Sequence, residues 1–180
     1  EILRCLVGSE MCIRDRTSWA YNILGQIYVV LPLALLGVWG YKSDYQLFMN
    51  TEYLLMALFV FVWTNDTGAY IVGCTLGKHR LFERISPKKS WEGFFGGLAF
   101  CIILASLANH IIPGMLSTAQ WIGMGILTSI FSTWGDLCES LLKRTAGVKD
   151  SGKILPGHGG ILDRFDSELI ASPVIFIYLT

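Results

Sequence analysis

The amino-acid sequence predicts an all-α, polytopic integral membrane protein with four to five transmembrane helices, some of them broken by polar residues. Of its 180 residues, 53% are hydrophobic and only 16% are charged, whereas a soluble domain usually carries about 25% charged residues. Between residues 94 and 135 there is no Asp, Glu, Lys or Arg. This composition argues against a disordered chain, a nucleic-acid-binding protein and an ordinary soluble enzyme.

Five apolar segments are candidates for the helices, because a membrane-spanning helix needs roughly 20 mostly apolar residues. They cover residues 19–39, 53–72, 94–112, 121–142 and 169–180, and the last is too short as it stands. We expect Asn65 and Asp66 to interrupt the second segment, and Pro113 to end the third. The C-terminal part of the fourth carries Asp136 and Glu139. Apolar runs of this length exceed a barrel strand, so helices are expected.

The charged residues are concentrated in two stretches. Residues 78–92 hold seven charges and residues 136–168 hold eleven, out of 28 in the chain. Each stretch contains a basic loop, and two predicted spans separate these loops, so both should lie on the same side of the membrane. The positive-inside rule places that side in the cytoplasm. We therefore expect both basic loops to lie in the cytoplasm.

The first 16 residues differ from the rest of the chain. The segment begins with Glu1 and has no apolar stretch of the length found in a signal peptide. We interpret residues 1–16 as non-native sequence. Residues 17–180 then form one membrane-embedded domain that is truncated at its N-terminal end.

Ionisable residues within predicted spans are functional candidates, because an ionised side chain at the bilayer centre is costly. Asp66 is one, although it can also be explained as a helix cap at a broken span. Asp136 and Glu139 are three residues apart and share one face of a helix. The alternative is that the span ends before Asp136 and that both acids are solvated.

A second group of candidates follows the helix break expected at Ser86 and Pro87. This break brings Lys88 and Lys89 together, and lysines bind phosphate as point charges. A purely topological role of the two lysines, as positive-inside residues, explains them equally well.

Residues 140–167 contain the richest pattern of functional residues. Glycines around His158 let backbone N–H groups turn toward an anion, and lysines and arginines supply positive charge. Asp163 and Asp166 have the i, i+3 spacing that places two carboxylates on one helix face. Oxygen ligands without a Cys/His pair favour a hard ion such as Mg²⁺. Together these features predict phosphoryl or nucleotidyl transfer.

The same stretch resembles the signature of the phosphatidate cytidylyltransferase (CDP-diacylglycerol synthase) family. Each defined position of that signature is matched in this sequence. The matching residues are Ser140, Lys143, Arg144, Lys149, Asp150, Gly152, Leu155, Pro156, His158, Gly159, Gly160, Asp163, Arg164 and Asp166. Upstream residues also resemble the family, among them Trp63, Asp66, Ser86-Pro87-Lys88 and Glu92-Gly93.

The resemblance implies that CTP and phosphatidic acid react to give CDP-diacylglycerol and pyrophosphate. It implies metal ligands at Asp136, Asp163, Asp166 and Glu139, which would hold Mg²⁺, with a monovalent cation left open as a further ion. Catalytic roles fall to Lys149, Asp150, His158 and Arg164. Substrate-binding roles fall to Lys78, Lys88, Lys89, Lys143, Arg144, Lys153, Gly157, Gly159 and Gly160. The family also suggests a homodimer.

Two alternative functions stay open. A CTP-dependent polyprenol or phytol kinase also combines CTP with a membrane fold, although it should lack the complete run from Lys149 to Asp166. A transporter also places polar residues in broken helices, but it has no obvious use for the cationic, glycine-rich stretch.

Overall fold

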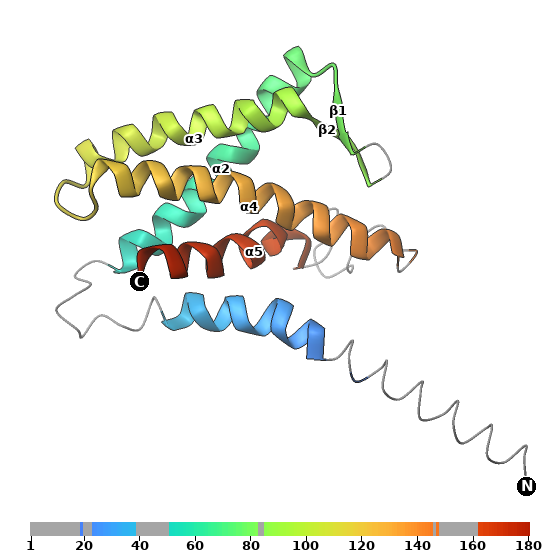
Figure 1. Cartoon of the computed structure of the whole chain (residues 1–180), viewed down its shortest axis with the longest axis horizontal. Helices are drawn as coiled ribbons and strands as arrows, with labels where there is room; N and C mark the ends of the chain where they lie inside the picture. The colour runs from blue at the N-terminus through green and yellow to red at the C-terminus, as the bar shows by residue number, and fades with distance from the viewer. Residues whose placement is uncertain (1–18, 20–22, 39–50, 83–84, 146, 148–161) are drawn as a thin grey trace, which may run out of the picture.

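A computed structural model describes residues 19, 23–38, 51–82, 85–145, 147 and 162–180 of the chain. The proposed non-native segment 1–16 lies outside these residues and stays a prediction. The described chain is a bundle of helices with one small β-hairpin (Figure 1). The predicted all-α fold is therefore confirmed.

The helices follow the predicted order, with somewhat different ends. An apolar helix covers Ile23–Val38, and the further helices are α2 (Thr51–Leu76), α3 (Trp91–Ile111), α4 (Thr118–Thr145) and α5 (Leu162–Leu179). Helix α5 begins seven residues before the predicted segment 169–180, since it includes the Asp163–Asp166 part of the signature. Among the described helices, α2 (over Tyr53–Leu76) and α3 are long and apolar enough to cross a membrane.

A β-hairpin that the sequence analysis did not predict lies between α2 and α3. Strands β1 (Arg80–Phe82) and β2 (Ser86–Ser90) pair antiparallel, with Arg80 opposite Ser90. Helix α3 starts directly after β2, because the Ser90 hydroxyl accepts a hydrogen bond from the Gly93 N–H at 3.1 Å and caps the helix. The short strands leave the helical class of the fold unchanged, but β2 carries Lys88 and Lys89 of the first charged stretch.

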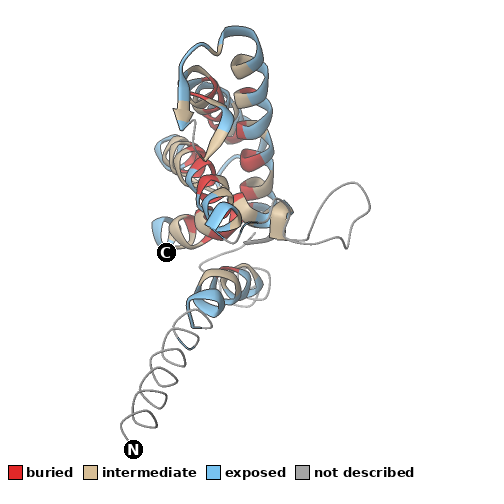
Figure 2. Cartoon of the chain, turned by 90° about the vertical axis from the view of Figure 1, so that its right-hand side faces the viewer, coloured by how far each residue is buried: buried red, intermediate tan, exposed pale blue. Residues whose placement is uncertain are grey.

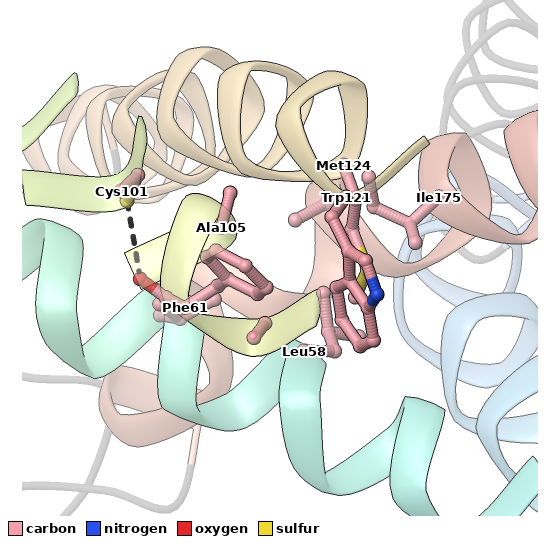
Figure 3. Close-up of a cluster of buried hydrophobic side chains, with 10 residues drawn as sticks. Leu58, Phe61, Cys101, Ala105, Trp121, Met124 and Ile175 are labelled. Atoms are coloured by element: carbon pink, nitrogen blue, oxygen red, sulfur yellow. Dashed lines mark hydrogen bonds between the residues drawn. The ribbon is translucent and has the colours of Figure 1, made fainter. Parts of the chain in front are cut away.

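The helices pack in sequence order, with α2 against α3, α3 against α4 and α4 against α5. Their shared core contains Leu58 and Phe61 of α2, Cys101 of α3, Trp121 of α4 and Ile175 of α5 (Figure 3). Figure 2 shows buried residues on the helix faces turned toward one another and exposed residues on the outside.

The outer faces are apolar, unlike those of most soluble proteins. Exposed large side chains include Trp63 and Tyr70 on α2 and Phe95, Ile103 and Ile111 on α3. An apolar surface of this kind is expected where a protein contacts another apolar phase rather than water. Together with the two long apolar helices, it supports the assignment as a membrane protein.

The expected break in α2 is not observed, and Asn65 finds partners inside the bundle. Helix α2 runs without interruption through Asn65 and Asp66. Asn65 is 2% exposed; its amide donates to the Ser132 hydroxyl at 3.0 Å and accepts from the Ser129 hydroxyl at 2.7 Å. These bonds join α2 to α4 and satisfy the buried amide without opening the helix.

Replacing Asn65 by Ala should therefore loosen the contact between α2 and α4. Loss of both interhelical bonds is expected to lower the free energy of unfolding by about 2 kcal/mol. The measurement is the unfolding midpoint of the purified protein in detergent. Thr67→Ala is the matched control, since the Thr67 hydroxyl is exposed and, within the described part of the chain, bonds only to the Trp63 carbonyl of its own helix. Equal midpoints for the two variants would contradict the proposed role of Asn65.

Candidate active site

The two charged stretches meet at one end of the helical bundle. Figure 1 shows the hairpin, the C-terminal end of α4 and the start of α5 at the same end. This arrangement agrees with the expectation that both basic segments face one side of the membrane.

An ion pair joins the hairpin to α4. The Lys89 ammonium of β2 lies 2.6 Å from Asp136 Oδ2, and it also donates to the Thr133 carbonyl at 3.4 Å. Both partners are only partly exposed, at 25% and 35% of their side-chain surface. Asp136 further accepts a bond from the Ser140 hydroxyl at 3.3 Å. The hairpin therefore places a cation on a predicted metal ligand.

Lys88 and Lys89 lie together at the hairpin, as expected from the sequence, and both line a pocket between the hairpin and the helices. Their partners differ. Lys89 is paired with Asp136, whereas Lys88 is exposed.

The base of the hairpin is closed by Glu92, the second residue of α3. Its carboxylate lies 2.7 Å from the His79 ring nitrogen Nδ1 and accepts a hydrogen bond from the His79 backbone N–H at 3.2 Å. The Trp91 N–H donates to the His79 carbonyl at 3.0 Å. These bonds fix β2 relative to the end of α2, so that Lys89 reaches α4.

A pocket of about 340 Å³ lies between the hairpin and the helices. We call it the hairpin pocket. Helix α2 lines it with Asp66 and Tyr70, the hairpin with Lys88 and Lys89, and α4 with Asp136.

A second ionic group links α4 to α5. The Lys143 ammonium donates to Glu139 Oε2 at 3.1 Å and to Asp163 Oδ1 at 2.9 Å. The side chains of Lys143, Glu139 and Asp163 are 19%, 1% and 12% exposed. Burial lowers the pKa of Lys143, but the hydrogen bonds to Asp163 and Glu139 outweigh this effect and leave the pKa above its ordinary value. Lys143 is therefore a protonated partner of the buried Glu139 and the partly buried Asp163.

Asp166 lies beside this ionic group because α4 and α5 approach each other closely. A side chain at Gly135 would place its Cβ 2.6 Å from the Asp166 carbonyl oxygen, so only glycine allows this approach. The Asp166 carboxylate accepts from the Ser167 N–H at 2.6 Å. Burial raises the pKa of Asp166, and the charge of Asp136 raises it further.

The donor types at this end suit a hard divalent cation, but their arrangement includes a lysine. Carboxylate oxygens are the ligands that Mg²⁺ prefers, and Glu139 Oε1 is buried without a hydrogen-bond partner in the described part of the chain. Lys143, however, occupies the position of a cation between Glu139 and Asp163. Within the described ranges, no group of three or more His, Cys, Asp or Glu residues is arranged to hold a metal. The metal assignment stays a prediction.

The other predicted site residues divide into two sets. The first set is exposed. It comprises Lys78, which follows the end of α2, Arg144 near the end of α4 and Arg164 in the first turn of α5. The second set lies outside the described residues and comprises Lys149, Asp150, Lys153, Gly157, His158, Gly159 and Gly160.

Sequence reasoning missed two features of the site. Glu168 of α5 is 4% exposed, and its Oε2 has no hydrogen-bond partner among the described residues. The sequence did not indicate that Glu168 is buried, because it is the last residue of the charged stretch 136–168. The bond between His79 and Glu92 was not predicted either, although Glu92 lies only three residues after Lys89. A hairpin prediction for residues 80–90 would have brought them together.

Removing Lys143 should take a cation away from the buried Glu139 and the partly buried Asp163. We expect Lys143→Ala to lower the free energy of unfolding by about 3 kcal/mol. Arg144→Ala removes an exposed neighbouring cation and should change it by less than about 0.5 kcal/mol. Chemical unfolding in detergent compares the two, and equal stability of both variants would refute the structural role of Lys143.

Known proteins similar to this chain have one enzymatic family in common. A family model described as the cytidylyltransferase family matches residues 7–180. A phosphatidate cytidylyltransferase of Staphylococcus aureus (strain COL) is 40% identical over 181 residues, which cover 98% of this chain and 69% of the relative. One from Staphylococcus haemolyticus (strain JCSC1435) is 40% identical over 159 residues, covering 88% of this chain and 61% of the relative. These matches confirm the resemblance found in the signature, and the chain is an enzyme that belongs to the cytidylyltransferase family.

Proposed function

We propose that this enzyme transfers CMP from CTP to phosphatidic acid, which yields CDP-diacylglycerol and pyrophosphate. The observation that carries the proposal is the 40% identity to a phosphatidate cytidylyltransferase along 98% of the chain. The complete signature and the ionic groups at the end of α4 support it.

The reaction needs no nucleophile from the protein, because the phosphate of the lipid is already anionic. One of its oxygens attacks the α-phosphorus of CTP, and the bond from that phosphorus to the leaving pyrophosphate breaks. The protein therefore acts by positioning the two substrates and by neutralising their charges.

The residues of the site fall into the roles that this reaction requires. Lys143, Arg144, Lys153 and the signature glycines would hold substrate phosphates, and Lys149, Asp150, His158 and Arg164 would act nearest the reacting atoms. We propose Asp136, Glu139, Asp163 and Asp166 as ligands of Mg²⁺. When bound, the metal neutralises phosphate oxygens and stabilises the leaving pyrophosphate. Because Lys143 now contacts two of these carboxylates, metal binding requires it to change partner.

The cellular setting follows from the substrates. CTP is dissolved in the cytoplasm and phosphatidic acid lies in the membrane leaflet. We propose that the charged end of the bundle faces the cytoplasm at the inner membrane of a bacterium, where the positive-inside rule places it. We also propose that the enzyme works as a homodimer.

One assay distinguishes this function from its alternatives. Membranes containing the chain are incubated with CTP labelled at the α-phosphate, Mg²⁺ and phosphatidate, and the lipids are separated. Labelled liponucleotide, absent from host membranes without the chain, is the expected product. A labelled polyprenyl phosphate from γ-labelled CTP would instead indicate a kinase. Uptake of a solute without either product would indicate a transporter.

The proposed metal ligands make a sharper prediction. Asp163→Asn and Asp166→Asn should each reduce Mg²⁺-dependent incorporation of CTP into lipid by roughly 100-fold or more, because an amide is a much poorer ligand than a carboxylate. Asp166→Glu keeps the carboxylate and is the control for loss of charge. Undiminished Mg²⁺-dependent activity of both Asn variants would disprove the metal assignment.

A further inference from the structure

The hairpin pocket lies where the two long apolar helices meet the charged end of the bundle. Ala69 and Tyr70 line it from the C-terminal part of α2, and Phe94 lines it from the first turn of α3. A ligand in this pocket is therefore next to the apolar outer surface of both helices, on which Tyr70 itself is 70% exposed.

The pocket contains two lysines in different electrostatic states. Lys89 is neutralised by Asp136 at 2.6 Å and bound to the Thr133 carbonyl. Lys88 is exposed and has no ion-pair partner among the residues that the structure describes. Ser86 and Ser90 of β2 line the pocket together with Lys88. Lys88 is thus the lysine available to an incoming anion.

The size of the pocket limits which anion can fill it. Its volume of about 340 Å³ is at the low end of the range for small-molecule pockets, roughly 300–1,000 Å³. A nucleoside triphosphate carries several negative charges and needs several cations, whereas this pocket offers one unpaired lysine. The pocket is also lined by the acids Asp66 and Asp136, so the smaller charge of a single phosphate monoester on a glycerol group suits it better than a triphosphate does, and the volume accommodates it.

We propose that the hairpin pocket binds the phosphate monoester head group of the lipid substrate, with Lys88 as its contact. Lys89 is a positioning residue that holds Asp136 toward the pocket. This inference rests on the proposed function, because it names the subsite for one of the two substrates. The acyl chains then extend along the apolar surfaces of α2 and α3, and the CTP phosphates bind elsewhere at the charged end.

Binding measurements on the purified chain in detergent test the inference without requiring turnover. The probes are dioctanoyl phosphatidate, glycerol 3-phosphate, inorganic phosphate and CTP, each titrated separately. Lys88→Ala should weaken phosphatidate binding by about tenfold or more, the factor expected when a charge-assisted hydrogen bond is lost, and leave CTP binding unchanged. Lys88→Arg should restore most of the affinity.

Two further variants separate contact from position. Arg80→Ala removes an equal charge from the same hairpin at an exposed residue that does not line the pocket, and it should bind phosphatidate like the unchanged protein. Lys89→Ala should lower kcat more than it raises the KM for phosphatidate, because it releases Asp136 rather than the lipid. Lys88→Ala should do the reverse.

Each outcome decides the question. Equal phosphatidate affinity in the Lys88→Ala and Arg80→Ala variants would overturn the inference, as would an equal loss of CTP binding in Lys88→Ala. Inorganic phosphate or glycerol 3-phosphate binding as tightly as phosphatidate would overturn the lipid assignment. Lys88-dependent phosphatidate binding without formation of CDP-diacylglycerol would support the pocket while contradicting the proposed function. Formation of CDP-diacylglycerol with an unchanged KM for phosphatidate in Lys88→Ala would support the proposed function and contradict the role of the pocket.

Discussion

The ion pair between Lys89 and Asp136 is the contact on which the arrangement of the site depends. It joins a strand of the hairpin to α4 across 2.6 Å, although the two residues lie far apart in the sequence. In surroundings less polar than water, such a pair is stronger than on an open surface, and loss of one partner is costly. The pair closes one side of the hairpin pocket and keeps Asp136 directed toward it. The contacts of Glu92 with His79 set the geometry that lets Lys89 reach this position.

Helix α4 carries the interactions that unite the bundle. Its buried residues include Trp121, Gly125, Thr128, Ser132, Gly135 and Glu139, which recur every three or four positions and so form one stripe. Along this stripe the chemistry changes from apolar to polar to charged. The apolar part packs in the core, the serines bind Asn65 of α2, and the charged part meets the hairpin and α5. Helix α4 therefore contributes both to the stability of the bundle and to the site, where it supplies Asp136 and Glu139.

The two ionic groups at the charged end have different environments and therefore different roles. Lys143 is mostly buried between Glu139 and Asp163, and it holds α5 against α4. Lys89 and Asp136 are more exposed and line a pocket. The more buried group holds two helices together, whereas the more exposed pair positions Asp136 beside the pocket. Both ammonium groups now neutralise acids that we propose as metal ligands.

The sequence by itself determined the fold class, the order of the helices and the family. Hydrophobic runs report helices in an apolar environment regardless of how those helices pack, and the signature from Ser140 to Asp166 is local in the chain. Tertiary structure decided what depends on distant partners. Helix α2 continues through Asn65 because two serines of α4 satisfy its amide. Lys88 and Lys89 line one pocket, and among the described residues only Lys89 forms an ion pair, with Asp136 of α4. Hydrogen bonds and ion pairs between segments are set by packing, which no local pattern encodes.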